Sequence, residues 1–455
     1  MASILEELPE TLDETYERVL REINKANREH ARRLLQCLTV ALRPLRVEEL
    51  AEVLAIDFDV PAQGGIPQLN PKWRWADQHH AVLSTCSSLI AIVDNGRLKV
   101  VQFSHFSVKE YLTSDRLARS SGDVSRYHIV LEPAHTILVQ ACLGALLRLG
   151  DRVNEDNVDD TPLVKYAARH WVDHARFESV CSRIREAMEY FFDADKPHWT
   201  PWCQVQKIDV SWDGFTPDEK LNDALPLYYA SLGGFYDLAE HLVGKHPEHI
   251  NARGGLMVTP LVAALHGKYF EVAELLHRHG ADVDVLGDEK VTPLLVACCF
   301  GLMDILHWLL DHGADMNVKN NELLFAPIEG VIENKQIEAF KMLIEYNTDV
   351  HIRPLYGTSL LHKAAISWEK HNQVDFTQIL LDHGVNPNAR DNDNATPLHH
   401  SSQSRGGAVE CTRLLLKHGA IIDAEDNEGR TPLQLALDHG RDDIATCLKE
   451  HGATR

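Results

Sequence analysis

The sequence has few basic residues and lacks the hydrophobic segments that mark a secreted or membrane-spanning protein. It contains 45 lysines and arginines against 67 aspartates and glutamates, for a formal net charge of −22. This charge opposes non-specific binding to nucleic-acid phosphates or anionic lipids and favours a basic partner surface. The opening residues lack the basic start and apolar core of a signal peptide. The best apolar stretch, residues 136–147, is too short to span a membrane and predicts a buried helix.

Cysteine spacing and nucleotide motifs exclude further classes. The nine cysteines are scattered, with no Cys-x-x-Cys pair, as expected for reduced thiols in a cytoplasmic protein. A phosphate-binding loop requires G-x-x-x-x-G-K-[ST], but His246 and Tyr269 follow the only two Gly-Lys pairs. We therefore expect no ATP binding, no cofactor and no enzymatic activity from this chain.

Histidine is abundant, with 26 residues, so a metal site has to be considered. The histidines to consider are His277 and His279 together with His246 and His249. No cysteine or glutamate completes a tetrahedral set with them at motif spacing. We therefore expect no metal site.

The strongest positive feature is an internal repeat. The triplet Thr-Pro-Leu begins at residues 259, 292, 396 and 431, and degenerate forms begin at 225, 326 and 359. Successive starts lie 33 to 37 residues apart. A period of about 33 residues that carries this phrase resembles the ankyrin family, over residues 225 to 455. The resemblance implies seven stacked units of two helices each.

The third repeat shows why these residues suit that fold. Thr292 is expected to cap the first helix with its hydroxyl, and Pro293 stands where a missing N–H has no cost. Apolar residues at helical spacing over 305–310 predict the second helix, which Gly313 can end in the left-handed conformation. The His-Gly ending recurs at residues 279, 383, 418 and 451. These histidines are expected to cap second helices.

Other repeats vary this plan. His362 and His399 follow the capping phrase, where ankyrin histidines hydrogen-bond the adjoining hairpin. The fourth repeat has Ala326 in place of the capping threonine and Tyr346-Asn347-Thr348 in place of the usual ending. We therefore expect the fourth repeat to be the least firmly held.

The N-terminal half shows a different pattern. Apolar periodicity predicts helices over residues 3–30, 32–42, 47–55 and 79–88, followed by strands over 89–93 and 98–103. Asn95-Gly96 is the preferred pair for a tight hairpin between such strands. Three helices and a hairpin are typical of a winged-helix domain. Because residues 79–93 contain no lysine or arginine, DNA binding by this domain is the least favoured alternative.

Several phrases in this half resemble the region that follows the NACHT NTPase in fungal Nod-like receptor proteins. They lie at residues 8–18, 43–50, 86–90 and 103–112, and residues 161–171 resemble the helical connector before an ankyrin array. Because the NTPase motif is missing, the resemblance implies the C-terminal part of such a protein. The implied regions are a helix after the missing NTPase (1–30), a winged-helix-like domain (31–120), a helical connector (121–215) and ankyrin repeats (216–455).

We therefore predict a mainly all-α fold, in which a helical winged-helix-like domain with a small β-hairpin precedes an ankyrin-repeat solenoid of about seven repeats. The hairpin tips and the exposed faces of first helices in such a solenoid form a concave surface for a protein partner. The candidate contact residues are Tyr229, Tyr236, Asp288, Glu289, Lys290, Tyr356, Trp368, Asp391 and Asp393. For Tyr229, as for Phe300, a core position is an equal alternative. The mostly acidic tips favour a basic or polar partner segment.

Two functions fit this organisation. The chain is either the partner-binding or ligand-sensing repeat region of a Nod-like-receptor-type protein, or a stand-alone cytoplasmic adaptor whose winged-helix module docks a second partner. A winged-helix DNA-binding regulator is the third and least favoured alternative. Neither a nucleic acid nor a membrane is expected as a partner.

Overall fold

The computed structural model describes residues 12–61, 63–75, 77–86, 88–96, 98–120, 122–150, 158, 160–193, 198–206, 224–255, 257–286, 291–317, 326–353, 357–366, 373–404 and 408–454. The chain forms two compact units, Met1–Gly267 and Lys268–Arg455. The first unit holds the N-terminal region, a helical connector and the first repeat helices. The second unit holds the remaining repeats.

The first unit begins with short helices around a small sheet. Its elements are α2 (Leu12–Glu22), η1 (Lys25–Asn27), α3 (Arg28–Val40), β1 (Leu45–Arg46), α4 (Val47–Leu54), β2 (Ile56–Pro61), η2 (Gln63–Gly65), β3 (Pro67–Leu69), η3 (Pro71–Trp73), α5 (Gln78–Cys86), β4 (Ile90–Asn95), β5 (Leu98–Phe103), α6 (Phe106–Leu112), α7 (Asp115–Ala118) and η4 (Asp123–Tyr127). Helices α3, α4 and α5 contact one another and bury apolar side chains such as Leu34 and Leu50.

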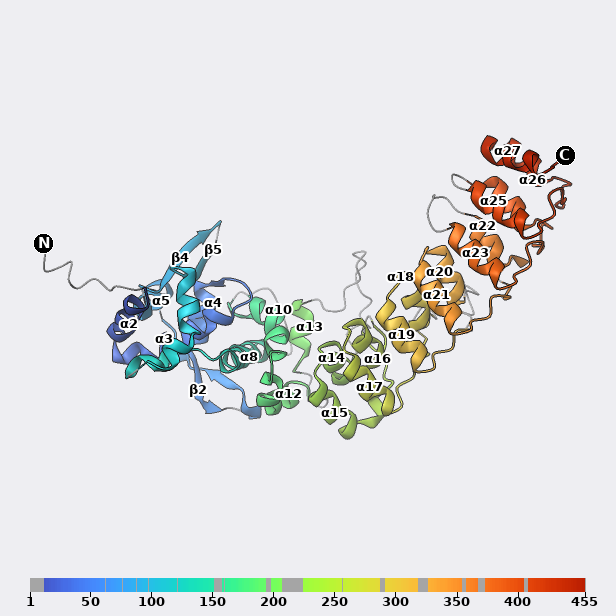
Figure 1. The fold of residues 1–455 in the computed structure, drawn as a ribbon. Coiled ribbons are helices and arrows are strands. Elements are labelled where there is room, and N and C mark those ends of the chain that lie inside the picture. Colours follow the sequence, from blue (N-terminus) through green and yellow to red (C-terminus); the bar gives the residue numbers. More distant parts are fainter. Residues whose placement is uncertain are drawn as a thin grey trace, which may run out of the picture. The chain divides into compact units, whose positions relative to one another are not determined.

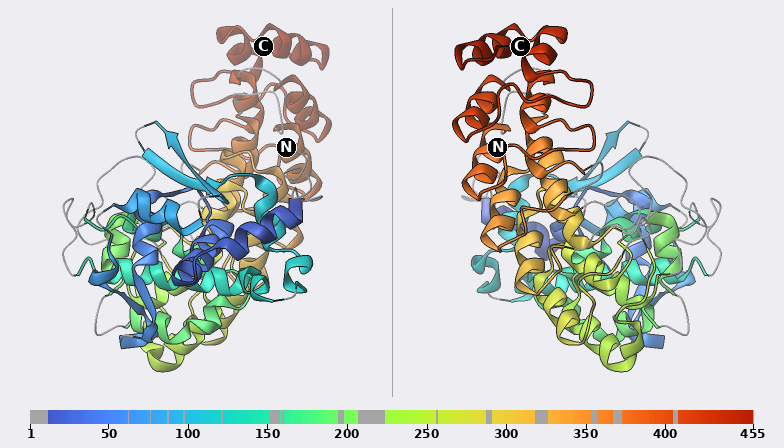
Figure 2. Two further views of the ribbon diagram at one scale, coloured as in Figure 1. Left: turned by 90° about the vertical axis from the view of Figure 1, so that its left-hand side faces the viewer. Right: turned by 90° about the vertical axis from the view of Figure 1, so that its right-hand side faces the viewer.

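The order of these elements is that of a winged helix. Strand β5 lies between β1 and β4, and both pairs are antiparallel. Strands β4 and β5 form a hairpin that projects beyond the neighbouring helices (Figures 1 and 2). Gly96, in the turn, has a φ of 68°, which glycine adopts more readily than other residues. The predicted three helices and hairpin are therefore confirmed.

Two details differ from the sequence prediction. The helix expected over residues 3–30 ends at Glu22 in its described part. Asn24 has an extended backbone and accepts a hydrogen bond from the N–H of Ala26 at 3.1 Å, which starts a separate short helix. A second antiparallel pair, β2 with β3, follows α4 and was not predicted.

The connector consists of α8 (Leu131–Leu147), α10 (Val164–Ala175), α11 (Val180–Arg183), α12 (Arg185–Phe191) and α13 (Thr200–Gln206). Helix α8 confirms the buried helix expected over residues 136–147. Trp171, which is fully buried on α10, lies with its ring 5.1 Å from that of Trp202 and 5.4 Å from that of Phe235. This aromatic cluster joins the connector to α14 (Pro226–Leu232), α15 (Tyr236–Lys245), η6 (Pro247–His249) and α16 (Pro260–His266).

A chain of buried polar side chains joins α8 to α10. Nδ1 of His135 lies 2.7 Å from Nδ1 of His174, and Nε2 of His174 lies 2.7 Å from the Tyr166 hydroxyl. The N–H of Leu42 donates to that hydroxyl oxygen at 3.2 Å. Tyr166 can then donate to His174, and His174 can donate to His135, so both histidines are neutral. Burial lowers the pKa of His135 to about 4 and that of His174 to about 3.

The second unit is a stack of helix pairs, shown in Figure 1 from α18 to α27. Its helices are α17 (Phe270–Arg278), α18 (Pro293–Phe300), α19 (Met303–Asp311), α20 (Pro327–Glu333), α21 (Ile337–Glu345), α22 (Leu360–Ala365), α23 (Gln373–Asp382), α24 (Pro397–Gln403), α25 (Ala408–Lys417), α26 (Pro432–Asp438) and α27 (Asp442–Glu450). First helices from α18 to α26 contact one another in sequence, and so do second helices from α19 to α27. This is the packing expected of ankyrin repeats.

The described repeats begin and end their helices at the residues that the sequence predicts. The hydroxyl of Thr292 accepts a hydrogen bond from the N–H of Leu295 at 3.2 Å. Gly313 has a φ of 81°, and Asn347 takes the same left-handed place in the fourth repeat with a φ of 61°. Ala326 has no hydroxyl to accept the N–H of Glu329, so the side-chain contact left at this helix start is that of the Glu329 carboxylate, which accepts the N–H of Ala326 at 3.3 Å. The expected looseness of the fourth repeat stays a prediction.

Candidate partner-binding surface

Helix α18 presents an apolar face to solvent. Val296 and Phe300, one helical turn apart, are 39% and 72% exposed, and Cys299 beside them is partly exposed. We call these three residues the α18 face. The opposite side of the helix is buried through Leu294 and Cys298. The side of α18 that carries Leu294 and Cys298 packs into the repeat stack, so Phe300 lies outside the core, where a partner could contact it.

The neighbouring first helix packs closely against α18. A Cβ atom added to Gly330 on α20 would lie 2.9 Å from Sγ of Cys299 and 2.9 Å from Cδ1 of Leu295. Atoms at that separation overlap, so this position admits only glycine without rearrangement. The absence of a side chain at Gly330 therefore lets the two helices approach closely.

Charged side chains adjoin the α18 face on the next two first helices. Nζ of Lys363 on α22 lies 3.2 Å from Oε2 of Glu329 and also pairs with Glu333, both on α20. Glu329 is almost fully buried, and burial raises the pKa of its carboxyl group. Glu333 remains partly exposed while it pairs with Lys363.

Buried histidines fix successive first helices to the next hairpin. Nδ1 of His362 accepts a hydrogen bond from the N–H of Ser359 at 3.0 Å, and its Nε2 bonds the carbonyl of Ala395 at 3.1 Å. His399 repeats both contacts with Thr396 and Arg430 one repeat later, as the sequence predicts. Because each histidine bridges two repeats through the backbone, it helps to hold the exposed faces in a constant orientation.

Second helices form an open groove of their own. It is lined by Phe270, Met303, Asp304, His307, Trp308, Asp311 and Met342, from α17, α19 and α21. The ring of His312 stacks on Trp308 with 3.9 Å between centroids, and its Nδ1 bonds the carbonyl of Trp308 at 2.7 Å. The helix-ending role predicted for this histidine is confirmed. The groove itself was not predicted, because second helices were treated only as core elements.

Two of the predicted contact residues have side chains that are turned away from solvent. Tyr229 is fully buried, with its ring against Trp202 and Tyr228, so the core alternative holds for it. The carboxylate of Asp391 is 6% exposed and accepts a hydrogen bond from the N–H of Asp393 at 3.0 Å, which closes its own hairpin. It therefore serves the turn rather than a partner.

The other predicted contact residues have mixed outcomes. Asp393 is exposed and Tyr236 is partly exposed. Five of the predicted residues, Asp288, Glu289, Lys290, Tyr356 and Trp368, lie outside the described residues. Phe300, for which a core position was an equal alternative, is the most exposed of the large hydrophobic residues in the described part of the chain. Its position as the last residue of a first helix, before Gly301, is the sequence signal that favours exposure.

Two groups of histidines and carboxylates gather potential metal ligands among the described residues. One comprises His362, Asp391 and His400, and the other comprises His246, Glu248 and His249. In the first group both ring nitrogens of His362 are already hydrogen-bonded, as described above. That group is therefore explained by its structural role. The second group includes Glu248, whereas the sequence predicted that no glutamate would complete a set with these histidines.

Comparisons with known proteins agree with this organisation. The family model for ankyrin repeats matches residues 222–320, 329–423 and 370–454, and the model for the GPI inositol-deacylase winged helix domain matches residues 17–122. A protein of Monascus ruber, described as azaphilone pigments biosynthesis cluster protein L, is 29% identical over 283 residues. This alignment covers 58% of the present chain and 58% of that relative.

In the described part of the chain, no helix has both the length and the apolar character to cross a bilayer. The fold and the family matches lead to one assignment. The chain carries a winged-helix domain near its N-terminus and ankyrin repeats in its C-terminal region.

Proposed function

We propose that this chain is a non-catalytic, cytoplasmic binding protein that holds a protein partner on the exposed first helices of its ankyrin repeats. The observation that carries the proposal is the α18 face, where Phe300 and Val296 are exposed on a helix whose other side is tightly packed. Aromatic side chains on a rigid support are typical anchors of protein interfaces. Ankyrin repeats generally serve such interactions, which agrees with this use of the surface.

The chemistry of the partner follows from the surroundings of this face. The apolar centre of the α18 face favours an apolar side chain on the partner, because burial of Phe300 would supply most of the binding free energy. The whole chain has a net charge of −22, and Glu333 and Asp393 are exposed carboxylates on the repeats. A partner segment with one large apolar residue flanked by lysine or arginine matches both properties.

The order of domains supports a more specific proposal. A winged helix followed by a helical connector and ankyrin repeats is the order that the Nod-like-receptor resemblance implies. In such a protein the NTPase acts as the switch and the repeats bind the ligand. We therefore propose that the repeats recognise the ligand while nucleotide chemistry is supplied from outside the residues present here.

The test compares two phenylalanines of equal exposure. Phe300 is 72% exposed on the repeats, and Phe106 is 71% exposed on the winged-helix region. The full chain with Phe300→Ala or with Phe106→Ala is used to capture partners from extracts of the source organism. Each captured protein is then purified, and its affinity is measured by calorimetry. We expect Phe300→Ala to weaken binding by more than about tenfold, as at interface hot spots, and Phe106→Ala to leave it unchanged.

The alternative outcomes have distinct meanings. Loss of a partner only with Phe106→Ala would favour the stand-alone adaptor, because the winged-helix module would then be the docking site. Unchanged affinity of every partner with both Phe300→Ala and Phe300→Glu, in variants with native circular dichroism, would exclude the α18 face as the binding surface.

A further inference from the structure

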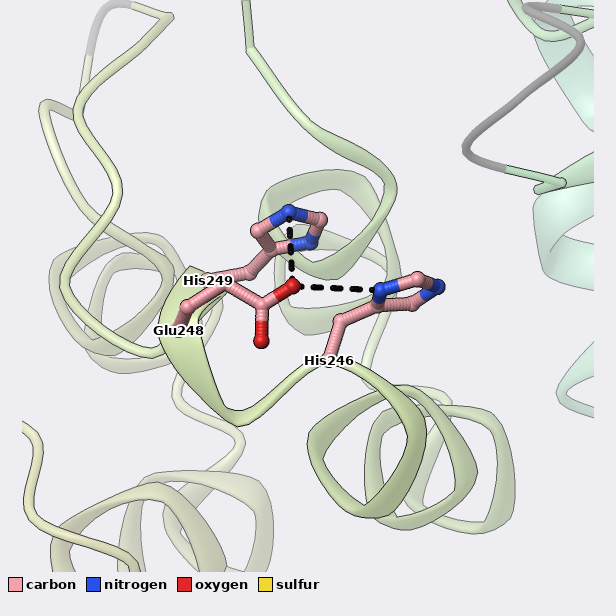
Figure 3. A group of neighbouring side chains, drawn as sticks. All are labelled: His246, Glu248 and His249. Atoms are coloured by element: carbon pink, nitrogen blue, oxygen red, sulfur yellow. Dashed lines mark hydrogen bonds and ion pairs between the residues drawn. The ribbon is translucent and has the colours of Figure 1, made fainter.

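The turn after α15 brings two imidazoles and a carboxylate together (Figure 3). Nδ1 of His246 lies 3.3 Å from Oε1 of Glu248, and Nε2 of His249 lies 3.7 Å from the same oxygen. One ligand atom from each residue lies within 4.8 Å of the other two. The carboxylate oxygen faces both rings, as the two dashed lines in Figure 3 show.

The backbone makes this arrangement local and well defined. The N–H of His246 donates to the carbonyl of Leu242 at 2.8 Å and ends α15. Pro247 begins the short helix η6, and the N–H of His249 donates to the carbonyl of His246 at 3.0 Å. A tight turn of this kind places residues one and four of the His-Pro-Glu-His segment on the same side. Both imidazoles therefore stand beside the intervening carboxylate.

These two histidines differ from those that end second helices elsewhere. Nδ1 atoms of His279, His312, His383 and His451 each bond a helix carbonyl at 2.7 to 2.8 Å. Within the part of the chain that the structure describes, the ring nitrogens of His246 and His249 that face Glu248 bond no backbone group. The side chains are only 22% and 21% exposed, so both rings are largely packed against their surroundings.

We propose that His246, Glu248 and His249 bind one Zn²⁺ ion, with water in a fourth position. Imidazole nitrogen and carboxylate oxygen are ligands that zinc accepts, whereas calcium and magnesium prefer oxygen alone. Tetrahedral zinc with bonds of about 2.0 to 2.2 Å keeps its ligand atoms roughly 3.3 Å apart. The separation of 3.3 Å between His246 and Glu248 already meets this value, and that of 3.7 Å between His249 and Glu248 is close to it.

Ion binding requires a small rotation of the rings. They are stacked with 4.9 Å between centroids and 12° between planes, so their lone pairs do not yet converge on one point. Rotation about the Cβ–Cγ bonds brings them together, and the Glu248 side chain, at 64% exposure, is free to follow. Without the ion, the Glu248 carboxylate is the group that contacts both rings. With the ion bound, both rings and the carboxylate contact the ion.

The surroundings favour a cation at this place. A pocket that includes His246 is also lined by Glu186, Glu189 and Asp193 of the connector, together with Lys245 and with His241, which pairs with Glu189. Carboxylates near a site raise the local concentration of a divalent cation. A bound ion would tie the end of α15 to the following turn, next to the connector. This inference is independent of the proposed partner surface.

The experiment uses the purified full chain, stripped of metal and kept reduced so that the cysteines do not oxidise. Zinc is titrated at pH 7.5 in competition with a chromogenic chelator. We expect one equivalent to bind, and His246→Ala, His249→Ala and Glu248→Gln each to weaken it by more than about tenfold, because even loss of an outer-shell partner costs 10 to 100-fold. The matched control is His307→Ala, which removes an exposed histidine that pairs with a single carboxylate, Asp311.

Two further readouts identify the ligands. Cobalt in place of zinc is expected to give the visible absorption of a tetrahedral site, and this absorption should disappear in the three variants. Binding should weaken in acid, because protonated imidazole cannot ligate. Binding of zinc that the three substitutions do not reduce, or no binding beyond that of the His246→Ala/His249→Ala double variant, would overturn the proposal.

Discussion

The two units hold their buried histidines in different ways. In the second unit, His362 and His399 bond backbone groups of their own and the following repeat, with the same distances each time. In the first unit, His135 and His174 bond each other and Tyr166, so the partners are side chains. In the repeats, the backbone group that bonds a histidine recurs with the period. In the first unit, the side chain that bonds a histidine has no equivalent elsewhere in the sequence pattern.

This difference also explains how far the sequence could be read. The roles of His362 and His399, the capping of α18 by Thr292 and the ending at Gly313 were predictable, because each contact lies within one repeat or one period away. The contact between His135 and His174 spans 39 residues of the chain without any period. Nothing in the local pattern indicates it, and the same holds for the β2–β3 pair.

The candidate sites show the same limit. The exposure of Phe300 follows from its place in the repeat, but the burial of Tyr229 depends on Trp202 of the connector, which the repeat pattern does not include. The carboxylate of Glu248 was not predictable as a third ligand, because its spacing from the two histidines matches no common zinc motif. The turn that brings it between His246 and His249 is too short and too irregular to appear in such a pattern.

The largest expected effect is that of acid on the first unit. The pKa values of His135 and His174, lowered to about 4 and about 3, lie below the ordinary value of 6.5 for an unfolded chain. Below pH 6.5 the unfolded state therefore binds more protons than the folded state. The contribution of the neutral pair to the free energy of unfolding is fully present above that pH. It should be lost as the pH falls toward 4, by on the order of 4 kcal/mol.

Hydrogen exchange measured by mass spectrometry between pH 7 and pH 4, corrected for the intrinsic rate, reports the two units separately. We expect His135→Phe to reduce the pH dependence of exchange in α8 and α10, because one titrating group is removed. His307→Gln, an exposed control on the second unit, should leave it unchanged. Equal pH dependence in wild type and His135→Phe would contradict the proposed role of the pair.

The second effect tests the backbone bridge of the repeats. His399→Ala leaves the buried N–H of Thr396 without its side-chain acceptor and removes one of two hydrogen bonds to the carbonyl of Arg430, which also accepts from the N–H of Asp426. The free energy of unfolding should therefore fall by about 2 kcal/mol. His399→Gln should lose only about 1 kcal/mol. The last repeat supports this expectation, because Gln434 accepts the N–H of Thr431 at 2.9 Å there.

Urea denaturation followed by far-ultraviolet circular dichroism gives these free energies. The control is His439→Ala, which removes an exposed histidine at the end of α26 and should change the stability by less than about 0.5 kcal/mol. If His399→Gln proves as harmful as His399→Ala, the cap contributes little and the contact with the next repeat accounts for the stabilisation.

The smallest effect compares two helical glycines, one from each unit. Gly330 faces Cys299 and Leu295 at 2.9 Å, whereas nothing lies within 4 Å of a Cβ atom at Gly244, near the end of α15. Alanine is favoured over glycine in a helix by roughly 0.5 to 1 kcal/mol. Gly244→Ala should therefore stabilise the chain by up to this amount. Gly330→Ala should destabilise it by about 1 kcal/mol, because overpacking costs more than the helix gains.

Opposite signs in the same denaturation experiment would show that the neighbouring repeat, and not the helix itself, selects glycine at position 330. The two substitutions add the same methyl group, so differences in solvation or in the unfolded state largely cancel. A Gly330→Ala variant as stable as Gly244→Ala would mean that the ends of Cys299 and Leu295 move aside at little cost. The α18 face would then be a deformable surface, and its fit to a partner would depend on adjustment rather than on a preset shape.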